Sequence, residues 1–157
     1  MLSVRIKAKY DLEFSMDWLD LYFAFEQAEI LCGINVETID DAKKACEKLR
    51  QLGSLIPIVT MGEQGAVVSE SEGQYDHVQI EKCSSVCDST GAGDSFVGTL
   101  ALLMAKRKDL PLKEQVKRAC RVASQSVEKK GTQTSYPTKD ELRFNLFEWD
   151  VKWFKRQ

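Results

Sequence analysis

Short apolar runs of strand character alternate with amphipathic helical patterns along the middle of this chain, and this alternation restricts its fold more than any other feature. The expected strands lie at 55–60, from 66 onward and around 78–80, and the expected helices at 39–52, 94–108, 112–127 and from 138 onward. Thr38 and Thr138 each open a segment with the form of a capping box. Strands that alternate with helices are typical of an α/β layered fold.

Composition narrows the classes of function. The 157 residues are enough for one domain with a hydrophobic core, and a net charge of -2 argues against a nucleic-acid-binding protein, which usually has a basic face. No run approaches 18 apolar residues and the first residues lack the apolar stretch of a secretory signal, so neither a membrane span nor secretion is expected. The five cysteines lack the paired spacing of zinc sites. We therefore expect a cytoplasmic protein.

The single histidine, His77, limits the chemistry further. One histidine excludes a site with several histidine ligands and leaves little room for a Ser-His-Asp or Cys-His catalyst. Because His77 lies in an alternating stretch, we interpret it as a half-exposed strand residue.

The strongest candidate for a functional site is the glycine-rich stretch DSTGAGDSF at 88–96, which runs directly into an apolar helix. Gly91 and Gly93 allow the backbone to approach a ligand closely, and consecutive amides at a helix N-terminus bind anions. Asp94 would repel such an anion, unless it takes a proton from an attacking hydroxyl while the amides hold a phosphoryl group. The alternative is that Asp94 is only a first-turn acid favoured by the helix dipole.

Four segments together resemble the pfkB (ribokinase-like) carbohydrate kinases. DSTGAGDSF is similar to the second signature of that family, and TMGEQG at 60–65 resembles its T-x-G-x-x-G turn, which contacts the phosphates of ATP. GTQTSYP at 131–137 resembles the segment that closes the monovalent-cation site of ribokinases, and AEILCG at 28–33 resembles the helix after the N-x-x-E motif. The resemblance covers about 27–142.

The resemblance implies a role for individual residues and the cofactors ATP, Mg²⁺ and K⁺. Asp94 would be the base that activates the sugar hydroxyl, and the anion hole would be formed by Gly91, Ala92 and Gly93. The residues along the nucleotide would be Thr60, Gly62, Glu63 and Gly65. The ligands of a potassium ion would be the side chains of Asp88 and Ser135 and the carbonyls of Thr90, Ser126, Lys129 and Gly131.

Two positions depart from the family pattern. Ala24 and Gln27 stand where N-x-x-E has Asn and Glu, which help to organise magnesium and phosphates in the family. An alanine side chain accepts no hydrogen bond, and glutamine lacks the charge of glutamate. How magnesium would be held therefore stays open.

The expected fold is a ribokinase-like layered sheet with flanking helices, from which the N-terminal half of the family's fold is missing. We assign 27–142 to the nucleotide-binding and catalytic part, 1–26 to no known segment and 143–157 to a C-terminal tail. The implied function is ATP-dependent phosphorylation of a small-molecule sugar, D-ribose to ribose 5-phosphate, with a homodimer conceivable only if the missing half were present. The alternative is an inactive remnant that binds a nucleotide or a partner. A Rossmann-type dehydrogenase is disfavoured because the glycine turn lacks GxGxxG spacing.

Overall fold

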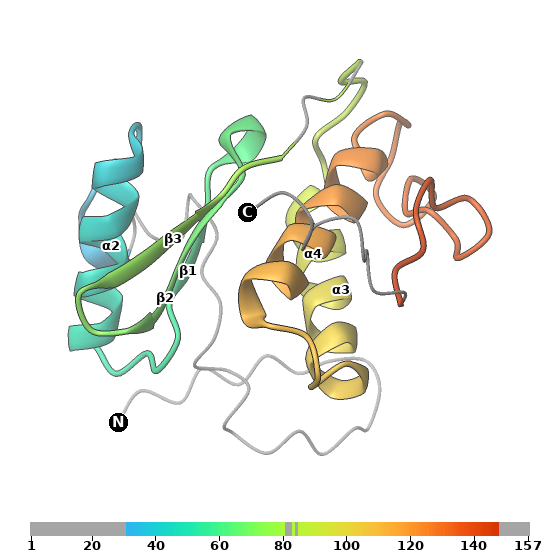
Figure 1. The fold of residues 1–157 in the computed structure, drawn as a ribbon. Coiled ribbons are helices and arrows are strands. Elements are labelled where there is room, and N and C mark those ends of the chain that lie inside the picture. The colour runs from blue at the N-terminus through green and yellow to red at the C-terminus, as the bar shows by residue number, and fades with distance from the viewer. Residues whose placement is uncertain (1–30, 81–82, 84, 148–157) are drawn as a thin grey trace, which may run out of the picture.

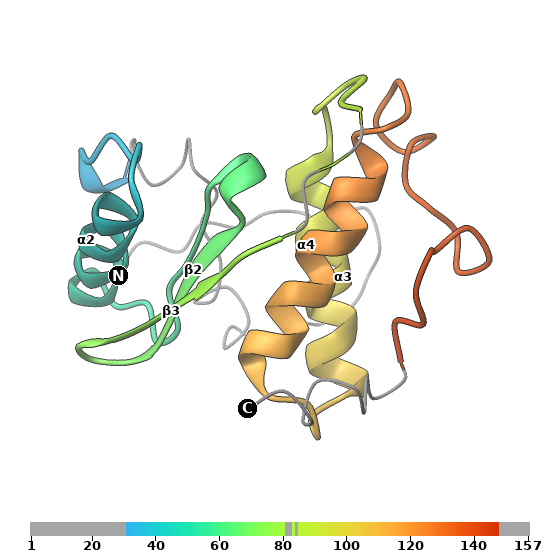
Figure 2. The same cartoon turned by 45° about the horizontal axis from the view of Figure 1, so that its top comes forward.

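A computed structural model describes residues 31–80, 83 and 85–147 of the chain. These residues form three layers, in which one helix covers one face of a small sheet and two helices cover the other (Figures 1 and 2). The elements in chain order are α2 (Ile39–Gln51), β1 (Ile58–Thr60), the 3₁₀ helix η2 (Gly62–Gln64), β2 (Ala66–Ser71), β3 (Gln74–Val78), α3 (Ala92–Lys106) and α4 (Leu112–Ser126).

The sheet has the order β1-β2-β3, with both pairs of neighbours antiparallel. Ile58 pairs with Val68 and Val59 pairs with Val67. Because successive side chains of a strand point to opposite faces, Ile58 and Val68 pack toward α3 and α4, whereas Val59 and Val67 pack toward α2. The β-branched residues of this stretch are therefore buried on both faces.

Two of the expected strands have different bounds in the structure. β1 begins only at Ile58, because Pro57 has no N–H to give to a ladder and its carbonyl instead accepts a hydrogen bond from the Ser69 N–H at 3.0 Å. β3 ends at Val78 instead of continuing to residue 80. β3 also begins before the expected position, at Gln74, because β2 extends to Ser71, which pairs with Gln74 across a two-residue turn.

The capping box at the start of α2 is confirmed. The Thr38 side chain accepts a hydrogen bond from the Asp41 N–H, and the Asp41 carboxylate accepts one from the Thr38 N–H. α2 then buries one face against the sheet. The cluster on this side consists of Val36, Ala42, Ala45, Cys46, Leu49, Val59, Met61 and Val67.

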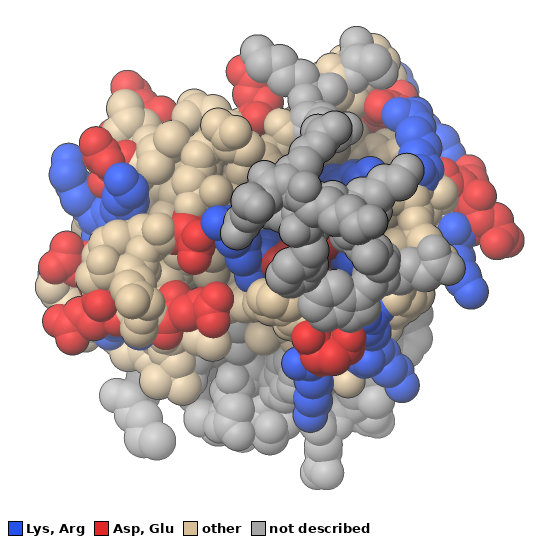
Figure 3. All heavy atoms as spheres, in the orientation of Figure 1, with Lys and Arg blue, Asp and Glu red and all other residues tan. Residues whose placement is uncertain are grey.

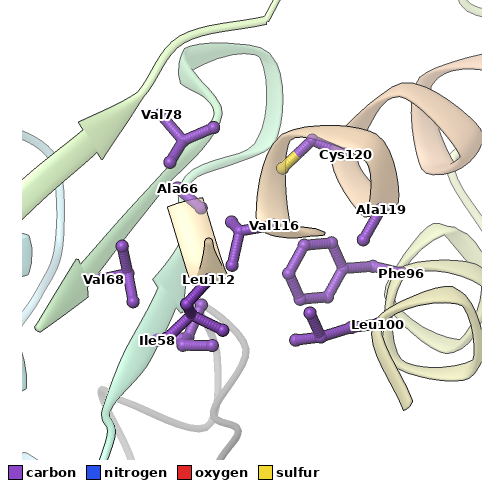
Figure 4. Close-up of a cluster of buried hydrophobic side chains, with 10 residues drawn as sticks. All are labelled: Ile58, Ala66, Val68, Val78, Phe96, Leu100, Leu112, Val116, Ala119 and Cys120. Atoms are coloured by element: carbon purple, nitrogen blue, oxygen red, sulfur yellow. The ribbon is translucent and has the colours of Figure 1, made fainter. Parts of the chain in front are cut away.

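The second cluster lies between the sheet and the α3–α4 pair (Figure 4). Phe96 is 2% exposed and points from α3 toward Val116 of α4. Burying a phenylalanine side chain contributes about 1.5–3 kcal/mol, so Phe96 holds the first turn of α3 firmly against the core. The cluster consists of Ile58, Ala66, Val68, Val78, Phe96, Leu100, Leu112, Val116, Ala119 and Cys120.

The helix expected from Thr138 onward does not form within the described residues, which end at 147. Only half of the capping box is present. The Glu141 carboxylate accepts from the N–H and the hydroxyl of Thr138, but the Glu141 N–H donates to the Thr138 carbonyl instead of its hydroxyl. The carbonyls that follow are taken by side chains of α4 and its preceding loop. Gln125 donates to the Glu141 carbonyl, Arg118 to the Leu146 carbonyl and Arg107 to the Phe147 carbonyl. These bonds hold the segment as an irregular chain.

None of the helices in the described part of the chain has the length and hydrophobicity of a membrane span. Acidic and basic side chains are intermixed on the face of the molecule drawn in Figure 3.

Candidate functional site

The glycine turn occupies the N-terminus of α3. Gly91 is the N-cap residue, with φ 83° and ψ 0°, and no side chain caps the helix. This left-handed conformation favours glycine, because any other L-residue places its Cβ close to the following carbonyl. The first helical hydrogen bond runs from the Ser95 N–H to the Gly91 carbonyl at 2.9 Å.

The three predicted anion-binding amides are not equivalent. The Ala92 N–H donates to the Ser89 carbonyl at 3.1 Å, which closes the turn before the helix, so this amide is engaged within the protein. The N–H groups of Gly91 and Gly93 donate to no partner within the part of the chain that the structure describes. Unpaired amides at an uncapped helix N-terminus attract anions through both their hydrogens and the helix dipole.

Asp94 lies in the first turn of α3 and is exposed, whereas the next two residues, Ser95 and Phe96, are buried. The helical period therefore directs Asp94 outward beside Gly93, on the same turn as the free amides. Burial raises the pKa of Tyr136 in the loop after α4, and the negative charge of Asp94 raises it further.

Asp88 links the glycine turn to the loop after α4. Its Oδ1 accepts a hydrogen bond from the Thr90 N–H at 3.0 Å, and its Oδ2 accepts one from the Gly131 N–H at 3.0 Å. The Thr90 side chain and these two amides lower the pKa of Asp88 to about 2. The carboxylate is therefore negatively charged throughout the physiological pH range, which favours a nearby cation.

The other predicted cation ligands differ in how directly they are connected to Asp88. Thr90 and Gly131 are bonded directly to Asp88. Ser135 is buried in the same loop as Gly131, and its hydroxyl donates to the Thr132 carbonyl at 2.6 Å. Ser126 lies at the end of α4, where its carbonyl accepts a weak hydrogen bond of 3.4 Å from the Lys129 N–H. The described residues contain no group of three or more His, Cys, Asp or Glu that could hold a metal ion.

The second glycine turn connects β1 to β2. Thr60 ends β1, Gly62 and Glu63 are exposed in η2, and Gly65 closes the turn by accepting from the Met61 N–H at 2.7 Å. A methyl group on Gly65 would lie 2.0 Å from the Val78 carbonyl oxygen, and Gly65 has φ 88°. Only glycine fits this position.

Sequence reasoning missed two residues at these turns. His77 is more than the half-exposed strand residue that the sequence predicts, because its Nε2 lies 2.7 Å from the Gln64 carbonyl oxygen and so supports η2. Tyr136 lies inside the GTQTSYP segment but was given no role, although its side chain contacts Gly91. Neither contact has a local sequence signal, since both join residues distant in the chain. Ala24 and Gln27 lie outside the described residues.

η2, the start of α3 and the loop after α4 lie at the same end of the molecule, the upper end in Figure 1, and Figure 2 agrees. Two surface cavities lie elsewhere. One, of about 370 Å³, is lined by 139–147, and the other, of about 230 Å³, lies between α2 and the β2–β3 turn.

The chain was compared with known proteins. It matches the pfkB family of carbohydrate kinases over residues 21–139. It is 42% identical to a ribokinase of Mus musculus over 122 residues, which are 77% of this chain and 38% of that protein. It is 38% identical to a deoxyribokinase of Salmonella typhi over 112 residues, which are 71% of this chain and 35% of the relative.

Solved structures agree with this relationship. The structure of Arabidopsis thaliana ribokinase complexed with ribose and ATP superposes with a TM-score of 0.69 at 26% identity, covering 80% of this chain and 41% of that one. The described α/β layers are thus part of a ribokinase-like fold, and the chain spans well under half the length of these relatives. The family match extends over most of the sequence and includes both glycine turns, so the chain belongs to the pfkB family of carbohydrate kinases.

Proposed function

We propose that this chain carries the phosphoryl-transfer site of a sugar kinase that transfers the γ-phosphoryl group of ATP to a sugar hydroxyl. The observation that carries the proposal is the exposed carboxylate of Asp94 on the same helical turn as the unpaired amides of Gly91 and Gly93. An acid beside an anion-binding turn opposes anion binding in the ground state. An acid and an anion-binding turn side by side can act together when a neutral alcohol must lose its proton as it attacks a phosphate.

In this proposal the carboxylate and the amides of the turn have different roles. Asp94 accepts the proton of the attacking hydroxyl, a role that typically contributes a factor of about 10²–10⁴ in rate. The amides of Gly91 and Gly93 stabilise the negative charge on the transferring group. The hydrogen bond from the Ala92 N–H to the Ser89 carbonyl makes the turn more rigid. The Ala92 amide could bind the transferring group only if that hydrogen bond opened.

The nucleotide would lie along Thr60, Gly62, Glu63 and Gly65. Supporting this, η2 presents Gly62 and Glu63 to solvent at the end of the molecule where α3 begins. Mg²⁺ would be bound largely through the phosphates of ATP, as is usual for this ion.

A potassium ion fits the chemistry of the donors near Asp88. The carboxylate there is ionised and accepts hydrogen bonds from the N–H groups of Thr90 and Gly131. The carbonyls of these two residues and the hydroxyl of Ser135, in the same loop as Gly131, are hard oxygen donors of the kind that suits such a cation. Asp88, Thr90, Ser126, Lys129, Gly131 and Ser135 would hold the ion, with some rearrangement at the Ser126 carbonyl. The bound charge would stabilise the loop that packs against the glycine turn.

For the acceptor we propose D-ribose, phosphorylated at O5. Ribokinases of mouse and of Dictyostelium discoideum are both 42% identical to this chain over the aligned residues. A deoxyribokinase and a guanosine-inosine kinase, at 38% and 36% identity, make deoxyribose and nucleosides the alternatives to test.

A second candidate function is nucleotide binding without turnover. It is favoured by the engaged Ala92 amide and by the replacement of both polar N-x-x-E positions by Ala24 and Gln27. In this case ATP would raise the melting temperature of the chain, but no sugar would be phosphorylated.

Release of ADP tests both functions. The full chain is assayed with ATP, Mg²⁺ and ribose, deoxyribose or inosine, with and without K⁺, alongside Asp94→Asn and the control Asp140→Asn, an exposed acid outside the turn. We expect ribose-dependent release that Asp94→Asn reduces by about 10²-fold or more while ATP binding is retained. If ADP release stays at a background level that no sugar increases, while ATP still stabilises the chain, nucleotide binding without turnover is favoured.

A further inference from the structure

The side chain of Tyr136 lies against the backbone of Gly91. A methyl group on Gly91 would lie 2.9 Å from the Tyr136 hydroxyl oxygen and 3.2 Å from its Cε1, and 3.3 Å from the Cα of Thr132. The face of the turn at Gly91 is therefore closed by the loop after α4. The φ of 83° favours glycine there, and any side chain at this position would press on the Tyr136 ring.

The loop that carries Tyr136 is itself held at three points. Gly131 donates its N–H to Asp88. Both the N–H and the hydroxyl of Ser135 donate to the Thr132 carbonyl, at 3.0 and 2.6 Å, and Ser135 is 1% exposed. Tyr136 therefore projects from a fixed base, and a rigid aromatic ring on such a base constrains what it touches.

We propose that Tyr136 is a positioning residue, whose ring holds the Gly91 turn in the conformation that presents the unpaired amides of Gly91 and Gly93. The importance of this role for catalysis rests on the proposed phosphoryl transfer. The contact between Tyr136 and Gly91 does not depend on that proposal, so it can be tested without any ligand.

The first experiment uses the full chain without ligand. Nuclear magnetic resonance follows the amide signals of Gly91 and Gly93. We expect Tyr136→Ala to displace both amide signals. Tyr75→Ala, in the cluster on the opposite face of the sheet, is the matched control and should displace neither.

The second experiment measures ATP binding by calorimetry. Tyr136→Ala should weaken binding on the order of tenfold, the effect of misplacing one charge-assisted hydrogen bond, whereas Tyr136→Phe keeps the ring and should restore an affinity within about threefold of the unaltered chain. Because Tyr136→Phe removes only one hydroxyl, it separates positioning from general loss of structure.

The outcomes separate this inference from the proposed function. Unchanged amide signals of Gly91 and Gly93 in Tyr136→Ala would overturn the inference whether or not the chain binds ATP. Equal ATP affinity of Tyr136→Ala and the unaltered chain would also overturn it. If the unaltered chain fails to bind ATP but Tyr136→Ala displaces the two glycine amide signals, the proposed function is contradicted and the positioning role is supported.

Discussion

The carboxylate of Asp88 accepts a hydrogen bond from the backbone N–H of Gly131, 43 residues further along the chain, at 3.0 Å. Its other oxygen accepts from Thr90, immediately before the glycine turn. One side chain therefore joins the entrance of α3 to the loop that follows α4. Replacing it should affect the turn and the loop together.

Asp88→Asn should abolish stabilisation of the chain by potassium. The amide side chain keeps one acceptor oxygen but loses the negative charge of the only charged ligand in the proposed set. We expect K⁺ to raise the melting temperature of the unaltered chain relative to an equal concentration of Li⁺, and to leave that of Asp88→Asn unchanged. Asp76→Asn, which removes an acid paired with Lys113 at the surface, is the control and should retain the K⁺ response. A K⁺ response that persists in Asp88→Asn would exclude this residue as a ligand.

Stability should fall steeply as the pH drops from about 4 to about 2. The pKa values of Asp88 and Glu141 are each lowered to about 2, the latter mainly by Lys129 and Thr138. In the unfolded chain such groups titrate near 4, so between these values the unfolded state binds more protons than the folded state. The stabilisation is therefore complete above about pH 4 and is lost as the pH falls through 2. Urea unfolding at several pH values measures the slope, which the Asp88→Asn/Glu141→Gln double variant should flatten. An equally steep slope in that variant would assign the acid sensitivity to other groups.

Features fixed by local chemistry could be predicted from the sequence. Thr38 caps α2 because a hydroxyl and a carboxylate three residues apart satisfy each other's amides, and Gly91 adopts a conformation that its neighbours require. Features fixed by distant partners could not. The end of β3 depends on its register with β2, and the missing last helix depends on carbonyls taken by Arg118 and Arg107. The contact between Tyr136 and Gly91 likewise requires the packed structure.

Gly65→Ala should destabilise the chain far more than Gly62→Ala. Both residues have positive φ, 88° and 57°, so each substitution carries a backbone cost of about 1–2 kcal/mol. A methyl group at Gly62 meets nothing within 4 Å, whereas one at Gly65 would lie 2.0 Å from the Val78 carbonyl oxygen. Relief of that overlap requires β3 to move, which brings the expected cost at Gly65 to about 3 kcal/mol or more. The midpoints of urea unfolding of the two variants measure the difference. Equal costs would contradict the tight approach of this turn to β3.

His77→Leu should loosen the turn that contains Gly62 and Glu63. His77 Nε2 lies 2.7 Å from the Gln64 carbonyl oxygen, so this nitrogen must carry the hydrogen and donate it. Loss of one such bond costs about 0.5–1.5 kcal/mol, and its effect on ATP affinity should be a weakening of about two- to tenfold. His77→Gln offers an N–H donor of similar reach and is expected to restore most of the affinity. Calorimetry with ATP compares the three proteins, and hydrogen exchange of the Gly65 amide, which bonds to the Gly62 carbonyl at 3.1 Å, reports the turn directly. Unchanged exchange in His77→Leu would show that η2 holds its shape without the histidine.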